Sequence, residues 1–323
     1  MTISVYLDIH IYMIVINLFK ALSDETRMRL LNLSVHYELN VNEIVSILEM
    51  GQSRISRHLK ILTDCGLLTF RRDGLWIFYS AAIKGEGFDF IQSIKHLFNH
   101  NSQFKIDLEA AEKCIVERSN KTTRFFDAIS KNWELLKQDI VGDLDLNGKI
   151  LKAIGASDTI VDLGCGTGDL LPLLKTKSVH VIGVEKSVKM LEEARKHYEL
   201  NRDGIDLRIG ELEHLPLRDE EAEIALTNLV LHHLSEPKKA IKEVHRILKT
   251  GGSFIIIDLH VHQDETMRKR YGDLWLGFSI DVLENWLKES GFLPQKVEHF
   301  NLKNGIKGFL HRSKKIKSSR RLI

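Results

Sequence analysis

The chain has 323 residues, enough for about two domains, and its composition of 43% hydrophobic and 28% charged residues excludes a wholly disordered or fibrous protein. Forty-six basic and 44 acidic residues leave a net charge of +2, so any polyanionic partner has to be inferred from local patches. Cys65, Cys114 and Cys165 are widely spaced, which excludes a disulfide framework and a zinc finger and suits a reducing compartment.

The first predicted element is a mostly apolar helix over residues 9–19, in a region that Asp8, His10 and Asn17 interrupt. It is too short and too polar to cross the ~30 Å hydrocarbon core of a bilayer, and no basic segment of a signal peptide precedes it. We therefore expect a cytoplasmic protein without a membrane partner, whose first helix packs inside the protein or against a second subunit. Met13 is an alternative start of the chain.

Residues 41–49 and 52–64 are predicted to form two short helices joined by a tight turn at Gly51, and a hairpin with a basic tip follows at residues 71–79. The second helix has an apolar stripe on one side and hydroxyl, amide and basic groups on the other. A helix of this kind fits the DNA major groove, where arginine reads guanine and serine and lysine hold phosphates. The predicted DNA-binding residues are Gln52, Ser53, Arg54, Arg57, His58, Lys60, Arg71 and Arg72.

Three motifs, at residues 21–27, 53–60 and 66–68, together with the wing, resemble the ArsR family of winged-helix repressors over residues 17–82. The resemblance implies a homodimer that binds an inverted repeat in double-stranded DNA. It outweighs the alternative interpretation, a basic helix face that is only solvated. Many metal-sensing members carry cysteines in the helix that begins near Glu38, where this chain has asparagine, so soft-metal sensing at that site is not expected.

A helical connection, residues 85–121, is predicted next, followed by an amphipathic helix over residues 125–136 that either caps a cofactor or packs in the core. From residue 159 onward, β-rich runs alternate with helical patterns, which predicts a mostly parallel sheet. Near the end, a hairpin is predicted around Asn304-Gly305, because Asn-Gly is a strong turn signal.

A buried strand, residues 159–163, runs into the glycine-rich segment 164–168. A P-loop would need lysine and Ser/Thr after its last glycine, and a dinucleotide fingerprint would need glycine where Asp169 stands. The sequence Asp162-x-Gly-x-Gly-x-Gly168 instead resembles motif I of the class I methyltransferases, which bind S-adenosylmethionine and release S-adenosylhomocysteine. We expect peptide amides left free around residues 164–168 to hold this cofactor.

The resemblance implies particular roles for several residues. Glu185 ends the second strand, where a carboxylate binds both ribose hydroxyls, Glu211 has the position that holds the adenine amino group, and Asn228 faces the methionine end. The predicted cofactor-binding residues are Asp162, Gly164, Cys165, Gly166, Gly168, Glu185, Lys186, Glu211, Leu212 and Asn228.

The predicted fold class is α/β, a winged helix-turn-helix followed by a seven-stranded, Rossmann-like class I methyltransferase domain. The expected boundaries are 1–84 for the DNA-binding and dimerisation domain, 85–121 for a helical linker, 122–312 for the methyltransferase domain and 313–323 for a basic tail. That tail is interpreted as solvated, with a supplementary DNA contact as the alternative.

Methyl transfer needs positioning more than a fixed set of catalytic groups. The candidate bases are therefore weak ones, His232, His233 and His260; the His260-x-His262 pattern with Asp264 is insufficient to predict a metal, and none is expected. The predicted function is a DNA-binding regulator whose methyltransferase domain acts on a small molecule. The alternatives are a repressor that senses S-adenosylmethionine or S-adenosylhomocysteine without turnover, and a methyltransferase whose head serves only for dimerisation, against which Ser53, Arg54 and Arg57 argue.

Overall fold

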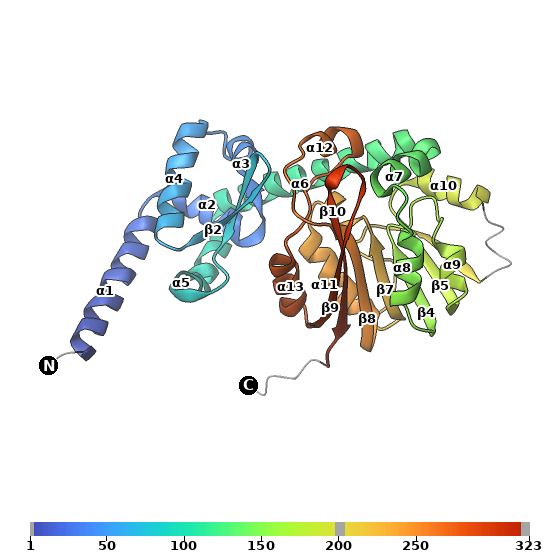
Figure 1. The fold of residues 1–323 in the computed structure, drawn as a ribbon. Coiled ribbons are helices and arrows are strands. Elements are labelled where there is room, and N and C mark those ends of the chain that lie inside the picture. The colour runs from blue at the N-terminus through green and yellow to red at the C-terminus, as the bar shows by residue number, and fades with distance from the viewer. Residues whose placement is uncertain (1–2, 198–203, 318–323) are drawn as a thin grey trace. The chain divides into compact units, whose positions relative to one another are not determined.

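The computed structural model describes residues 3–197 and 204–317, and the chain divides into two compact units, Met1–Glu117 and Arg118–Ile323 (Figure 1). The division falls within helix α6 (Ser102–Ile129). It differs from the predicted boundaries, because residues 85–117 belong to the first unit, where Phe98, Phe104 and Ile115 are buried in its core. Within the described residues, no helix has the length and apolarity needed to span a bilayer.

The first unit is mostly helical and carries the predicted helix-turn-helix. Asn40 and Glu43 form a capping box that starts α3, since the Asn40 side chain accepts the Glu43 N–H (3.1 Å) and the Glu43 carboxylate accepts the Asn40 N–H (2.9 Å). Asparagine therefore fixes the start of a helix at this position. The elements of this unit before α6 are α1 (Ile3–Leu22), α2 (Glu25–His36), β1 (Leu39–Asn40), α3 (Val41–Leu48), α4 (Gln52–Asp64), β2 (Leu68–Asp73), β3 (Trp76–Ala81), α5 (Gly85–Ile94) and η1 (Lys95–His100).

A small antiparallel sheet with the order β1-β3-β2 forms the wing, and Phe70 pairs with Tyr79 across it. The core beneath α4 contains Ile55, Leu59 and Leu62, which are fully buried, as the apolar stripe predicted. Arg29 of α2 makes a bidentate ion pair with Asp107 of α6, at 2.7 and 2.8 Å, and so joins the start of this unit to its end.

The second unit contains a seven-stranded sheet with the order β6-β5-β4-β7-β8-β10-β9, covered by helices, and this confirms the predicted fold class. All its neighbouring strands pair in parallel except β10, which runs antiparallel to both β8 and β9 and forms the predicted closing hairpin. Its strands are β4 (Ser157–Leu163), β5 (Ser178–Glu185), β6 (Ile205–Ile209), β7 (Ala222–Asn228), β8 (Leu248–Leu259), β9 (Phe292–Asn301) and β10 (Lys307–Lys315).

Helices and short 3-10 turns connect these strands and cover the sheet. They are η2 (Ser130–Asn132), α7 (Trp133–Val141), α8 (Leu146–Ala153), α9 (Leu171–Lys175), α10 (Val188–His197), η4 (Leu231–His233), α11 (Pro237–Ile247), α12 (Thr266–Tyr271), α13 (Ile280–Glu289) and η5 (Lys303–Gly305). The core they enclose is aliphatic, and Ile160, Leu226 and Ile257 on three adjacent strands are inaccessible to solvent.

Two sequence-based predictions need correction here. The single helix predicted over residues 125–136 is broken by η2, where the Ser130 hydroxyl bonds to the Asp127 carbonyl (3.3 Å) and α7 starts afresh at Trp133. The predicted basic tail begins inside the sheet, because β10 continues to Lys315 against its two neighbours; residues 318–323 of that tail lie outside the described residues.

Candidate functional site

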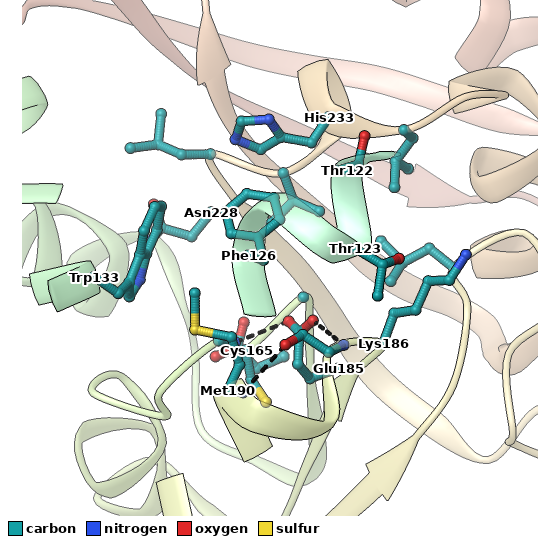
Figure 2. A pocket seen from close by; sticks show the side chains of 18 of the residues that line it. Thr122, Thr123, Phe126, Trp133, Cys165, Glu185, Lys186, Met190, Asn228 and His233 are labelled. Carbon is teal, nitrogen blue, oxygen red and sulfur yellow. Dashed lines mark hydrogen bonds between the residues drawn. The ribbon is translucent and has the colours of Figure 1, made fainter. Parts of the chain in front are cut away.

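A cavity lies at the carboxyl ends of β4, β5 and β7, beside the C-terminal part of α6 and the start of α7 (Figure 2). This is where ligands bind in open parallel sheets, because the strand order reverses around the first strand. Every residue of the cavity belongs to the second unit. Its polar and charged lining consists of Ser119, Thr122, Thr123, Lys137, Asp162, Asp169, Glu185, Lys186, Ser187, Glu213, Asn228 and His233.

The glycine-rich segment turns the chain sharply at the floor of this cavity. Gly164, Gly166 and Gly168 have positive φ angles of 74°, 56° and 80°, which side chains other than glycine rarely adopt. A Cβ atom on Gly164 would lie 2.7 Å from Val230 Cγ2. The sequence therefore needs glycine here both for the backbone conformation and for the close approach of the loop after β7.

The expectation of free amides around residues 164–168 is wrong for most of this segment. The N–H groups of Gly164 and Cys165 both donate to the Val184 carbonyl, at 2.7 and 3.1 Å, and the N–H of Gly168 donates to the Cys165 carbonyl at 2.9 Å. The N–H of Gly166 donates to Glu185 (3.1 Å). The segment can thus hold a ligand chiefly through its shape, because its amides already stabilise the turn itself.

Glu185 lies at the end of β5, as predicted. Its side chain joins the glycine-rich segment after β4 to the segment that follows β5. Its carboxylate accepts the N–H of Gly166 (3.1 Å) and the N–H of Ser187 (2.8 Å). Burial raises the pKa of Glu185, although these backbone N–H groups oppose the shift. A carboxylate held in this way at a cavity wall still has lone pairs to accept two hydroxyl groups.

Asp162, at the end of β4, is buried beside this carboxylate. Burial raises its pKa to about 7, and the charges of Asp169 and Glu185 act in the same direction, while Lys137 opposes them. Lys137 is itself held by Asp169, at 2.6 Å from the carboxylate oxygen. Asp162 therefore takes up a proton near neutral pH in the folded protein.

We expect Asp162→Asn to stabilise the protein at high pH. Because the folded-state pKa lies above the ordinary value of 3.8, the folded state binds more protons than the unfolded state between these pH values, and the free energy of unfolding falls as pH rises through that window. The variant should gain about 1–2 kcal/mol over the wild type at pH 8 and clearly less at pH 5. Chemical denaturation of both proteins, with the exposed-site variant Asp143→Asn as control, measures this; equal differences at both pH values would contradict it.

Two acidic residues that follow β6 differ in their relation to the cavity. Glu211 does not line the cavity; its half-exposed carboxylate pairs with Lys186 at 2.8 Å. Leu212 and Glu213 line it instead, and Glu213 is only 7% exposed. Glu213 accepts the Ser235 hydroxyl (3.3 Å), and burial raises its pKa. Sequence reasoning missed Glu213, whose only signal is its position two residues after Glu211.

Asn228 lies at the end of β7, and it lines the cavity. Its Oδ1 atom is buried and lacks a hydrogen-bond partner among the described residues. An unsatisfied buried acceptor is costly, so a donor from a ligand would be stabilised here. Cys165 also lines the cavity, and burial raises the pKa of its thiol well above the ordinary value, so the thiol stays protonated.

The three candidate histidines have different fates. His233 lines the cavity and meets the ring of Phe126 edge to face, with centroids 4.8 Å apart. His232 is buried directly behind it, with ring centroids 3.9 Å apart. His260 does not line the cavity and instead lies near His299, with ring centroids 5.9 Å apart. Among the described residues, His232, His233 and Asp273 are the group whose ligand atoms lie close enough to hold a metal ion.

The predicted DNA-binding residues are mostly on one exposed face of α4. Gln52, Ser53, Arg54, Arg57 and Lys60 are exposed, which agrees with the prediction of a polar recognition face. His58 is instead buried, with Nδ1 3.8 Å from Asp24, because its position lies on the apolar side of the helix. Burial lowers the pKa of His58.

In the wing, only one of the two predicted arginines is exposed. Arg72 points to solvent, whereas the Arg71 side chain pairs with Glu38 (3.2 Å) and lies over the Phe78 ring, 5.1 Å from its centroid. Alternation along β2 explains the difference, since neighbouring residues of a strand point to opposite faces.

Comparison with protein families gives two matches. Residues 24–69 match the family described as "Bacterial regulatory protein, arsR family", and residues 161–256 match the family described as "Methyltransferase domain". Both resemblances inferred from the sequence are thereby confirmed.

Individual proteins resemble parts of the chain. An arsenite methyltransferase of Halobacterium salinarum is 31% identical over 118 residues, which span 35% of this chain and only 30% of that protein. A demethylmenaquinone methyltransferase of Chlorobaculum parvum is 25% identical over 205 residues, or 59% of this chain and 83% of that protein. The crystal structure of the cyclase SpnF superposes with a TM-score of 0.51 at 15% identity, covering 60% of this chain and 94% of that one, which shows a common fold.

Proposed function

Because the chain carries an arsR-family helix-turn-helix segment and a methyltransferase domain, we propose that it is a DNA-binding regulator that also methylates a small molecule with S-adenosylmethionine. The observation that supports it most is the Glu185 carboxylate, fixed by the Gly166 and Ser187 amides beside the glycine turn. In this proposal the regulator acts as a homodimer on an inverted repeat. We propose a cytoplasmic location, where the protein has access to DNA.

The cavity residues fit this cofactor in three places. Glu185 would accept the two ribose hydroxyls, Asn228 Oδ1 would accept from the amino group of the methionine part, and the positive-φ glycines leave room for it. When bound, the cofactor supplies a methyl group already activated by a sulfonium centre. The protein has then to orient an acceptor and exclude water, which Phe126 and Trp133 are placed to do at the cavity wall.

The charge of the cavity favours catalysis over passive sensing of the spent cofactor. Its lining contains three carboxyl groups, Asp169, Glu185 and Glu213, together with Asp162, whose pKa of about 7 leaves it partly ionised, against two lysines, Lys137 and Lys186. Such a lining attracts the positively charged sulfonium more strongly than the uncharged thioether that remains after transfer. Product release is thereby favoured, which an enzyme needs and a sensor of S-adenosylhomocysteine does not.

Arsenite is disfavoured as the methyl acceptor, although one relative carries the name arsenite methyltransferase. Trivalent arsenic is a soft centre that binds sets of thiolates. Cys165 is the only one of the three cysteines at the cavity, and its buried thiol stays protonated. We therefore propose an acceptor without a soft metalloid, such as the ring compounds that the name demethylmenaquinone methyltransferase suggests for the other relative.

Two measurements test the proposed function. Titration calorimetry with S-adenosylmethionine and S-adenosylhomocysteine should give binding to the full chain, tighter for the sulfonium; no heat from either would reject the cofactor site. Incubation with methyl-labelled S-adenosylmethionine and a cell extract should then label a small-molecule fraction. Cofactor binding without any labelled acceptor, combined with a gel shift on the upstream DNA that changes with either ligand, would support the sensing repressor instead.

A further inference from the structure

His233 and three further side chains, from three distant parts of the sequence, converge in the interior. His232 Nδ1 lies 2.6 Å from Asp258 Oδ1, and His232 Nε2 lies 3.6 Å from Asp273 Oδ1. The Nδ1 atom of His233 lies 3.8 Å from the same Asp273 oxygen. Both carboxylates are shielded from solvent, at 0% and 3% exposure for Asp258 and Asp273. Neither cofactor binding nor any other role described above uses this group.

Hydrogen bonds fix the carboxyl group of Asp258 on both of its oxygens. Its carboxylate accepts the N–H of Leu231 (2.9 Å), the N–H of Leu259 (2.7 Å) and the Nδ1–H of His232. Both carboxyl oxygens of Asp258 therefore have a hydrogen-bond partner, and the group is held beside the His232 ring. Burial opposes a charge on His232, but Asp258 and Asp273 outweigh it, and the pKa of His232 is raised.

His233 differs from His232 in its hydrogen-bond partner and in the direction of its pKa shift. Its Nδ1 atom lies 3.3 Å from the Gly272 carbonyl, and a carbonyl only accepts, so Nδ1 carries the hydrogen and Nε2 keeps its lone pair. Burial and the charge of His232 place the pKa of His233 well below its ordinary value. The two rings, whose centroids lie 3.9 Å apart, thus have pKa values shifted in opposite directions.

The neutral ring belongs to the cavity wall, beside apolar side chains. Phe126 meets His233 edge to face, and Leu229, Val230 and Leu234 also line the cavity. Figure 2 draws Phe126 in the middle of the site, between His233 and Glu185. An acceptor with a flat apolar body fits such walls, with a polar group placed against the ring nitrogen.

We propose that His233 is the catalytic base of an acceptor subsite, that His232 with Asp258 and Asp273 positions it, and that the methyl acceptor is an aromatic hydroxyl compound. The inference rests on the proposed function. On transfer, the acceptor oxygen forms the C–O bond, the C–S electron pair returns to sulfur, and the hydroxyl proton passes to Nε2 of His233. Asp273 then lies close enough to stabilise the imidazolium that results.

The first test reads the protonation of the two rings directly, without turnover. Two-bond 1H–15N spectra of histidine-labelled full chain, assigned with His232→Gln and His233→Gln, should show His232 as imidazolium and His233 as the neutral Nδ1–H form at pH 7. Asp273→Asn should lower the pKa of His232, whereas the exposed-site control Asp281→Asn should leave both rings unchanged. A charged His233 in the wild type at pH 7 would overturn the proposal.

The second test uses 4-nitrocatechol as a probe, because its phenolate absorbs visible light. With S-adenosylhomocysteine present, the wild type should bind the probe and raise its phenolate absorbance below the pH at which the free probe ionises. His233→Gln keeps an acceptor atom there but takes up no proton, so its complex should show at least a tenfold smaller phenolate signal. Equal signals, or no binding of the probe to the wild type, would overturn the acceptor subsite.

Titratable groups lie behind His233 and around the cavity that it lines. They are His232, Asp258 and Asp273 behind it and, around the cavity, Lys137, Asp162, Asp169, Glu185, Lys186 and Glu213. Calorimetry with S-adenosylhomocysteine separates the two hypotheses: no binding to the wild type defeats the proposed function, whereas normal binding with an unaltered probe signal in His233→Gln defeats only this inference. A stoichiometric metal ion in the purified protein would also overturn it, by making both histidines ligands.

Discussion

Glu185→Ala is expected to weaken the binding of S-adenosylhomocysteine about 100-fold, a loss of about 2.7 kcal/mol. Two effects add. The ribose loses its charge-assisted hydrogen bonds, and the N–H groups of Gly166 and Ser187 lose the acceptor that holds the cavity floor in place. Titration calorimetry on the full-length variant measures the affinity, and circular dichroism confirms that the variant is folded.

Glu192→Ala is the matched control, because Glu192 is an exposed glutamate of helix α10 outside the cavity lining. It removes the same charge and should bind the ligand as the wild type does. If Glu185→Ala bound within threefold of the wild type, the ribose would have to lie elsewhere in the cavity. Glu185→Gln separates the two effects, since it retains an acceptor for the backbone N–H groups but loses the charge.

Arg57→Ala is expected to reduce binding to DNA from the chain's own upstream region about 100-fold. Arg57 projects from the exposed face of α4, and a guanidinium that contacts a guanine edge gives about 1–3 kcal/mol of discrimination. In the proposed homodimer both copies lose this contact. Fluorescence anisotropy at two salt concentrations is the measurement.

The salt dependence shows which kind of contact is lost. A base contact lowers the affinity with little change in the salt slope, whereas a phosphate contact lowers the slope by about 0.9 for each copy. Arg195→Ala, an exposed arginine of helix α10, removes the same charge from the methyltransferase domain and should bind DNA normally. Unchanged DNA binding by Arg57→Ala would exclude α4 as the recognition helix.

Two of the residues predicted to bind DNA have partners that no local pattern reveals. His58 lies on the side of α4 that packs over the core, near Asp24. The Arg71 side chain bonds to Glu38, thirty-three residues earlier in the chain. In both cases a partner distant in the sequence decided the orientation of the side chain.

The sequence by itself determined the local elements and the broad fold: the two helices around Gly51, the glycine turn after β4, the position of Glu185 and the closing hairpin. Helical periodicity, the need for positive φ and strand alternation all act within a few residues, so they can be read from the chain directly.

Only the tertiary structure decided which groups meet. The N–H groups of the glycine turn are occupied because Val184 and Glu185, on the neighbouring strand β5, accept their hydrogen bonds. Glu213 lines the cavity and Glu211 does not, because the chain turns between them. Asp258 follows His232 by 26 residues and Asp273 follows Asp258 by 15, and only packing brings both carboxyl groups next to the His232 ring. Protonation depends on distance and burial in three dimensions, which no local pattern of residues records.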